Sequence, residues 1–301
     1  MAMEGDAAAV RAEEGIVLRT QPSFTTKLAR WCRKNPVGVV GWVLIMILLA
    51  MAAFADVAST HEPNNLAGNI NELPTSTHYL GTDLVGRDIF SRLLHGARVS
   101  LAVGFWAVFM GVTAGLLLGL VSAYVGGVFD LLMQRLVDAN IAIPGIVLAL
   151  VIVAVLGPSV TNVIIALAVN YISTSARVTR SVVLREKARV YVEAARSLGA
   201  SSTRIMFLHV LPNSISPYLV LVSVSIGSAI IGEASLSFLG AGVGADTASW
   251  GSMLSTAAAR PYDVSWTLAL APGMAIALAV LGFNLFADSL RDTLDPRLRN
   301  R

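Results

Sequence analysis

The 301-residue chain has little charge and a single cysteine, Cys32. One cysteine excludes an intramolecular disulfide and any metal site built on a cysteine cluster. Charged residues make up 14% of the chain, against roughly 25% in soluble globular proteins. Hydrophobic residues make up 55% of it, and the mean hydropathy is +0.70. So little charge cannot cover the surface of a folded soluble domain, and the composition excludes both a soluble single-core protein and a disordered chain.

The local patterns of hydrolytic enzymes and metal sites are missing too. The chain contains neither a His-Glu-x-x-His nor a Gly-x-Ser-x-Gly pattern. Metal ligation would require distant histidines to converge, so a structural or interfacial role is expected for each of the four, which are His61, His78, His95 and His209. We therefore expect no catalytic residue, no metal ion and no cofactor bound by this chain.

Residues 81–88 (GTDLVGRD) have the glycine spacing of a phosphate-binding loop. They lack the lysine that reaches the phosphates, and Asp88 stands where a magnesium-binding hydroxyl belongs. A carboxylate at that position repels phosphate, so ATP binding is not expected. The simpler interpretation is a turn in which Asp83 or Asp88 caps the following helix.

Long runs without charge are abundant. A bilayer core takes about 20 helical residues, and six runs are long enough to cross it. The third and fourth share 38 residues between Asp138 and Arg177, divided by a Gly-Pro-Ser turn at 157–159. The remaining four lie at 35–55, within 99–129, from 214 to 233 or slightly beyond, and at 264–287. The pattern predicts an all-α integral membrane protein with six transmembrane helices.

The positive charges predict the orientation. With the N-terminus inside, the cytoplasmic segments carry 18 lysines and arginines and the outer segments carry four, as the positive-inside rule requires. The expected layout has cytoplasmic tails at 1–34 and 288–301, an outer loop at 56–98 and a core of spans two to six at 99–287. The net charge of +3 thus reflects topology rather than nucleic-acid binding. Cleavage after the first span as a signal peptide is the alternative, but 34 residues ahead of it are too many.

The end of the outer loop has the pattern of an amphipathic helix. Apolar residues occupy one face (Ile89, Phe90, Leu93, Leu94, Ala97) and polar residues the other (Arg87, Ser91, Arg92, His95, Arg98). We expect this helix to lie along the outer membrane interface, with its arginines among the lipid head groups.

Two features inside the predicted spans stand out. Gly111, Gly115 and Gly119 form a ridge of small residues that allows close helix approach, either within the chain or with a partner. Glu233 is the one acidic or basic residue well inside an apolar run, near its outer end. It either lines a substrate path or gate, or takes part in structural hydrogen bonds. One peripheral carboxylate is too little for a proton- or ion-coupled carrier, so energy for uphill transport should come from another subunit.

The predicted cytoplasmic loop 177–213 is too apolar for a simple linker. The pattern predicts a helix over about 185–198 that stops at Gly199, then a short helix capped by Ser201 or Ser202 that ends before Pro212. Two short helices with an apolar face could dock a partner or cover the chain's own bundle.

The loop resembles a known family. Glu193, Ala194 and Ala195, then Gly199, His209, Leu211 and Pro212, match the EAA motif of permease subunits of bacterial ABC importers. Residues 193–213 resemble the dipeptide, oligopeptide and nickel branch in particular, as do 80–101, 232–254 and 281–299. The resemblance extends from about residue 37 to the C-terminus and is greatest for the C-type subunit. Residues 244–246 depart from it, since the branch usually has a segment rich in glutamine and proline there.

The resemblance implies a type I importer fold in the bacterial inner membrane, with the EAA helices seated in a groove of a cytoplasmic ATPase. Implied partners are a second homologous permease, two ATPase domains that hold ATP and magnesium, and an extracytoplasmic binding protein. Cargo in this branch includes dipeptides, oligopeptides, nickel chelates, glutathione and haem. The alternatives are an autonomous secondary transporter or channel, and a membrane enzyme, for which no catalytic constellation exists.

Overall fold

The computed structural model describes residues 32–244, 246–259 and 265–294. The predicted tail 1–34 lies largely outside these residues and half of the tail 288–301 does, as do Ala245 and Arg260. The described residues from 37 onward form one compact unit, built of helices and loops with one isolated β-bridge between Thr82 and Asp88. The helices are α3 (Pro36–Ala53), α4 (Ala55–Ala58), α5 (Ile89–Val125), α6 (Gly127–Ala142), α7 (Gly145–Leu156), α8 (Val160–Lys187), α9 (Val190–Ser197), α10 (Ser202–Ile205), the π-helical turn η1 (Met206–Val210), α11 (Leu211–Phe238), α12 (Trp250–Ala258) and α13 (Trp266–Leu294).

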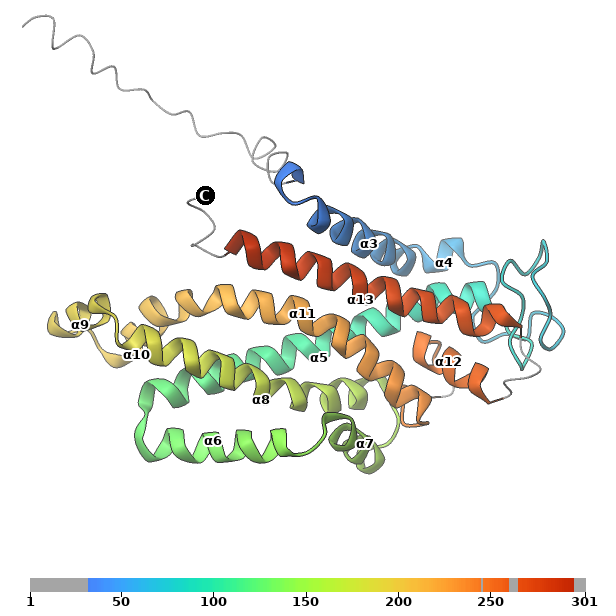
Figure 1. Cartoon of the computed structure of the whole chain (residues 1–301). Helices are drawn as coiled ribbons and strands as arrows, with labels where there is room; N and C mark the ends of the chain where they lie inside the picture. The colour runs from blue at the N-terminus through green and yellow to red at the C-terminus, as the bar shows by residue number, and fades with distance from the viewer. Residues whose placement is uncertain (1–31, 245, 260–264, 295–301) are drawn as a thin grey trace, which may run out of the picture. The chain divides into compact units, whose positions relative to one another are not determined.

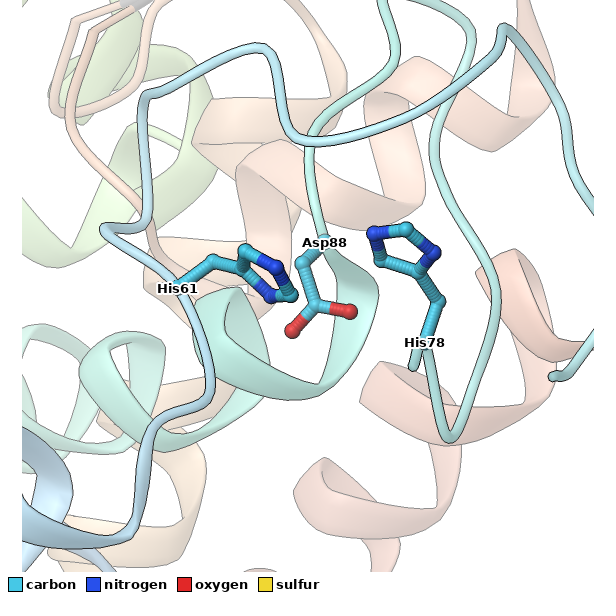
Figure 2. A group of neighbouring side chains, drawn as sticks. All are labelled: His61, His78 and Asp88. Carbon is cyan, nitrogen blue, oxygen red and sulfur yellow. The ribbon is translucent and has the colours of Figure 1, made fainter. Parts of the chain in front are cut away.

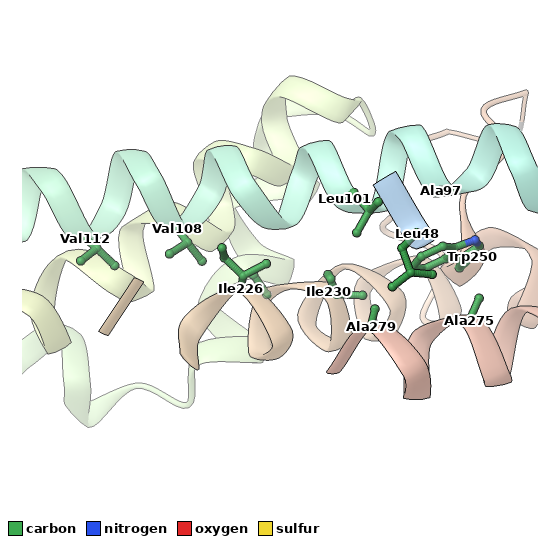
Figure 3. Close-up of a cluster of buried hydrophobic side chains, with 11 residues drawn as sticks. Leu48, Ala97, Leu101, Val108, Val112, Ile226, Ile230, Trp250, Ala275 and Ala279 are labelled. Atoms are coloured by element: carbon green, nitrogen blue, oxygen red, sulfur yellow. The ribbon is translucent and has the colours of Figure 1, made fainter. Parts of the chain in front are cut away.

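The long helices α5, α8, α11 and α13 lie side by side along one direction (Figure 1). Helix α3 contacts α13, with Gly41 against Gly282 and Phe286. The main core lies between α5, α11 and α13, closed by Trp250 of α12 and Leu48 of α3 (Figure 3). Trp250 is fully buried and donates its indole hydrogen to the Leu93 carbonyl, 3.1 Å away. A buried tryptophan needs such an acceptor, so this bond fixes α12 against α5.

The prediction of a separate interfacial helix at the end of the outer loop is wrong. Residues 89–98 are the first turns of α5, which continues unbroken for 37 residues, about 55 Å. Asp88 caps this helix, since its side chain accepts from the Ser91 amide. Arg92, expected among head groups, is 2% exposed and donates to the Pro63 carbonyl and the Asn64 side chain, both at 3.0 Å. Arg92 therefore binds the 59–88 loop rather than lipid.

A second arginine on the same face joins α5 to the end of the first span. Arg98 donates to both carboxylate oxygens of Asp56, at 2.9 and 2.8 Å, and its Nε donates to the Ala52 carbonyl. This bidentate contact holds the pKa of the Asp56 carboxyl below its usual range. Residues 89–98 are amphipathic as expected, but the arginines of their polar face bind other parts of the protein.

The predicted third span is interrupted at Pro144. Proline restricts the preceding residue to extended backbone, and Ile143 has φ −89° and ψ 127°. Helices α6 and α7 consequently meet at 91°. Helix α7 has 12 residues, about 18 Å, and is too short to cross a bilayer alone.

By length and composition, four described helices could cross a membrane, or five if the bent α6–α7 pair counts as one span. They are α3, α5, the continuous run Ser202–Phe238 and α13. Helix α8 is not among them, because its second half, from Asn170 to Lys187, contains many polar and charged residues. The all-helical prediction is confirmed for the described residues, whereas six spans with both termini inside stay a prediction.

Candidate functional site

The loop joining α8 to α11 contains three short elements, α9, α10 and η1, which we call the tip helices. Helix α8 ends at Lys187, so the expected helix over 185–198 is divided in two. Ser201 caps α10 by accepting from the Arg204 amide. We had expected the second short helix to end before Pro212, and that expectation is wrong. Pro212 is the second residue of α11 and directly follows the π-helical turn η1, and helix continues from Ser202 to Phe238.

Gly199 ends α9 in the way its position predicted. It has φ +78°, a backbone region that non-glycine residues rarely adopt. Its amide donates to the Arg196 carbonyl at 3.0 Å, and the Ala200 amide donates to the Ala195 carbonyl at 3.1 Å. These two bonds make a Schellman motif, which turns the chain sharply from α9 into α10.

An apolar base fastens the tip helices to the bundle. Val192, Ile205 and Val210 are at most 1% exposed. They pack on the C-terminal end of α5 and on Val183 of α8. Lys187 also donates to the Tyr124 carbonyl at the end of α5, 2.6 Å away, and so satisfies a helix-end acceptor. The tip helices are therefore held in a fixed position relative to α5 and α8.

A polar cluster joins the two ends of the loop. Tyr191 donates to Glu186 at 3.0 Å and stacks on His209, with ring centroids 6.4 Å apart. Asn213 donates to the Tyr191 hydroxyl at 3.2 Å and to the His209 carbonyl at 2.7 Å. Burial, with the Glu186 hydrogen bond second, raises the pKa of Tyr191 above its ordinary value.

The outward side of the tip helices is left uncovered. Leu198 is 88% exposed and Val190 is 79% exposed, and the neighbouring Phe207 and Leu208 are exposed as well. Glu193, Ala194 and Gly199 are exposed, whereas Ala195 packs partly into the apolar base. No atom lies within 4 Å of the position that a Gly199 Cβ would take. The EAA-like residues thus form a protruding apolar surface on a rigid base, and Leu211 and Pro212 begin the helix behind it.

A groove of about 1130 Å³ opens beside this surface. Its walls come from α8, α11, α13 and the tip helices. They carry both charged and apolar side chains, among them Arg185, Glu186, Tyr191, Asn213 and Arg291.

The glycine ridge of α5 faces α8. A Cβ at Gly111, Gly115 or Gly119 would overlap the carbonyl oxygens of Ala168, Ile172 and Ala176, respectively. Ser175 of α8 donates to the Val112 carbonyl at 2.7 Å along the same contact. Of the two alternatives for the ridge, the contact within the chain is the one present here, and it aligns α5 with the helix that leads into the tip helices.

Glu233 lies in a closed pocket of hydroxyl groups. Its side chain is 0% exposed. Ser237 and Ser249 donate to one carboxylate oxygen, each at 2.8 Å, and Ser100 donates to the other at 3.1 Å. Glu233 does not line the groove beside the tip helices. This burial argues against the path or gate role and favours the structural one, since Glu233 joins α5, α11 and the start of α12.

We expect Glu233→Ala to lower the free energy of unfolding by about 1–3 kcal/mol, because three buried hydroxyls lose their acceptor. Glu233→Gln is the matched control, since its amide oxygen can still accept from Ser237 and Ser249. Thermal unfolding in lipid nanodiscs measures the difference. Equal melting temperatures for the two variants would contradict the structural role, and a well-folded Glu233→Gln without transport would restore the path or gate role.

Sequence reasoning missed one ion pair near the tip helices. Asp130 of α6 is largely buried and receives two hydrogen bonds from Arg180 Nε at 3.0 Å and one from Nη2 at 2.7 Å. These residues are 50 positions apart, so spacing could not have paired them. The pair joins α6 to α8 at the end of the bundle that carries the tip helices.

Comparison with known proteins places this geometry in a family. Residues 111–300 match the family described as binding-protein-dependent transport system inner membrane component. The matched region contains the α5 glycines, the tip helices and Glu233.

Curated relatives match along most of their length. The dipeptide transport system permease protein DppC of Alkalihalophilus pseudofirmus is 40% identical over 274 residues, covering 89% of this chain and 88% of the relative. The glutathione transport system permease protein GsiD of Pectobacterium atrosepticum is 40% identical over 294 residues, covering 94% and 97%. GsiD of Escherichia coli O6:K15:H31 is 42% identical over 269 residues, covering 89% and 88%. With its helical spans and its protruding α8–α11 loop, the chain belongs to the inner-membrane components of binding-protein-dependent transport systems, the permease subunits of ABC importers.

Proposed function

We propose that this chain is one of two permease subunits of an ATP-driven importer that carries small peptides inward across the cytoplasmic membrane. The observation that carries the proposal is the uncovered apolar surface of the tip helices on their fixed base. An apolar surface of this kind costs free energy in water and marks an interaction site. A cytoplasmic ATPase subunit is the partner this family leads us to propose for it.

In this proposal, Glu193, Ala194, Ala195 and Gly199 form the coupling surface. Small alanines permit close seating of a partner, and Gly199 provides the turn between the two halves of the surface. Stacking of His209 on Tyr191 keeps the far half in place. Leu211 and Pro212 pass the displacement into α11, because helix runs without interruption from Ser202 to Phe238. ATP and magnesium bind to the ATPase partners and not to this chain.

The substrate path lies between this chain and a second, homologous permease. The groove beside the tip helices opens at the end of the bundle where the charge distribution predicts the cytoplasm, and it supplies one wall of the inner vestibule. An extracytoplasmic binding protein delivers the cargo to the opposite end. No nucleic-acid partner is proposed, since the basic residues concentrate in the predicted cytoplasmic segments.

Dependence on an ATPase separates this proposal from an autonomous carrier or channel. The chain is reconstituted in liposomes alone, with the second permease, and with both permeases plus the ATPases and binding protein. We expect uptake only in the complete system with ATP and magnesium, and none when a non-hydrolysable nucleotide replaces ATP. Uptake by the chain alone, without nucleotide, would overturn the proposal in favour of the secondary transporter or channel.

Peptide cargo is proposed because the printed names of the relatives specify dipeptides and glutathione, which is itself a tripeptide. The test is a calorimetric screen of the binding protein encoded beside this gene against dipeptides, longer peptides, glutathione, nickel chelates and haem. Micromolar or tighter binding of a peptide class supports the proposal, whereas selective binding of haem or a nickel chelate would overturn this part of it.

A further inference from the structure

Three potential metal ligands meet at the end of the bundle opposite the tip helices. His61, His78 and Asp88 come from three separate segments of the region between α4 and α5 (Figure 2). One ligand atom of each residue lies within 4.8 Å of those of the other two. The two imidazole rings stack, with centroids 4.9 Å apart. The expectation that this chain holds no metal depended on the absence of convergence, and the fold supplies convergence.

Two atoms of this cluster are buried without a hydrogen-bond partner. His78 is 6% exposed and its Nε2 has none, and Asp88 is 0% exposed and its Oδ1 has none. A buried polar atom without a partner costs about 1–3 kcal/mol, so native proteins rarely leave one unless a water or ion completes it. Here two such atoms, one on an imidazole and one on a carboxylate, belong to a single cluster.

The other polar atoms of the cluster are already engaged. Asp88 Oδ2 accepts from the Ser91 amide at 2.8 Å and from the Thr60 hydroxyl at 3.1 Å, which leaves Oδ1 free. His78 Nδ1 lies 3.5 Å from Glu72 Oε2, and His61 Nδ1 lies 3.1 Å from the Thr60 hydroxyl. Metal-binding histidines commonly donate their second nitrogen to a carboxylate or other acceptor, which directs the remaining lone pair at the metal.

We propose that His61, His78 and Asp88 bind a divalent transition-metal ion of the zinc class. Two nitrogen ligands favour zinc over calcium or magnesium, which prefer oxygen. With Glu72 behind His78, two carboxylates balance the two positive charges of the ion, and water completes a tetrahedral set. Ligands around one zinc ion lie about 3.3 Å apart, given bonds of about 2.0–2.1 Å. The ligand atoms, which all lie within 4.8 Å of one another, must therefore approach one another by at most about 1.5 Å when the ion binds.

The bound metal would fasten the outer region to α5. His61 follows α4 closely, His78 lies in the middle of the 59–88 loop, and Asp88 is the N-cap of α5. One ion joins all three, and does so independently of peptide transport and of ATPase docking. The site is therefore structural, and its loss should not remove the chain's fold.

The test uses the full-length chain in lipid nanodiscs, purified without a polyhistidine tag. Dialysis against zinc followed by elemental analysis should give about one zinc per chain, and zinc should raise the melting temperature. Cobalt should give the visible absorption of a tetrahedral nitrogen and oxygen site. The double variant His61→Gln/His78→Gln should lose the bound zinc, the thermal shift and the cobalt spectrum.

Two further variants keep the proposal falsifiable if the double variant folds poorly. Glu72→Gln leaves all three ligands in place and should weaken zinc binding about 10–100-fold, as loss of a carboxylate behind a ligand does. His95→Gln is the matched control, because His95 contacts Asp56 and the Ser91 carbonyl outside the cluster. Zinc binding that is absent from the native chain, or unchanged in the double variant and in Glu72→Gln, would overturn the proposal.

Discussion

Replacing Gly115 with alanine is expected to lower the free energy of unfolding by about 2–3 kcal/mol, although alanine is the better helix former. The new methyl group would overlap the Ile172 carbonyl and lie 2.6 Å from the Ser175 Cβ. Backbone atoms of α8 cannot move aside as a side chain can, so α5 and α8 must separate. We expect the pair Gly111→Ala/Gly115→Ala to prevent native packing, with sharply reduced abundance in the membrane.

The control for this prediction is Gly273→Ala in α13, where no atom lies within 4 Å of the new Cβ. The higher helix propensity of alanine is then the only effect, and the free energy of unfolding should rise by about 0.8–1.0 kcal/mol. Unfolding of both variants in nanodiscs, monitored by tryptophan fluorescence, shows whether each substitution lowers or raises the free energy of unfolding. A Gly115→Ala chain as stable as the native one would show that α5 and α8 are not held by close backbone contact.

Gly199→Asp is expected to abolish transport and transport-coupled ATPase activity while the chain still inserts and folds. No atom lies within 4 Å of the position that a Cβ would take at Gly199, so the substitution causes no overlap at the Cβ and adds a negative charge to the proposed ATPase contact. We expect at least a tenfold loss of uptake in the reconstituted system, together with loss of ATPase stimulation by the binding protein.

Gly199→Asn separates charge from backbone strain. Asparagine and aspartate tolerate the φ of +78° about equally, but asparagine adds no charge. Gly199→Asn should retain more uptake than Gly199→Asp at equal abundance. Normal uptake by Gly199→Asp at normal abundance would contradict the coupling role of this surface.

Features set by local backbone chemistry were predictable from the sequence. Gly199 follows an amphipathic run and ends its helix, because glycine adopts a positive φ readily. The three α5 glycines recur every fourth residue, so they share one helix face whatever packs on it. The EAA-like spacing likewise identified the loop that protrudes from the bundle.

Features that depend on which helix lies opposite were not predictable. The sequence pattern of 89–98 indicates one polar helix face. The same pattern is expected whether that face contacts lipid head groups, water or another part of the protein. Only the 59–88 loop, folded over Arg92, decides among them. Glu233 shows the same ambiguity, because its serine partners come from three places in the chain.

Two prolines have effects opposite to those expected from the sequence. Pro144 was passed over within an apolar run and bends the chain by 91°, whereas Pro212 was taken as a stop and lies in the first turn of a continuing helix. The difference lies in the preceding residues: Ile143 is extended, while Val210 and Leu211 are already helical. The cluster of His61, His78 and Asp88 had no local signal, since gaps of this length carry no periodicity.

The unbroken helix from Ser202 to Phe238 has a mechanical consequence. It spans 37 residues, about 55 Å, with the tip helices at one end and the Glu233 hydroxyl cluster near the other. A rod of this kind acts as a lever arm, so that a tilt imposed at the tip helices swings the far end the opposite way about the helices packed on its middle. The helix can bend most easily at the π-helical turn Met206–Val210 and at Pro217. The turn lies close to the end that carries the tip helices, whereas Pro217 lies near the middle, so the stretch from Pro217 to Phe238 is the stiffer part of the rod.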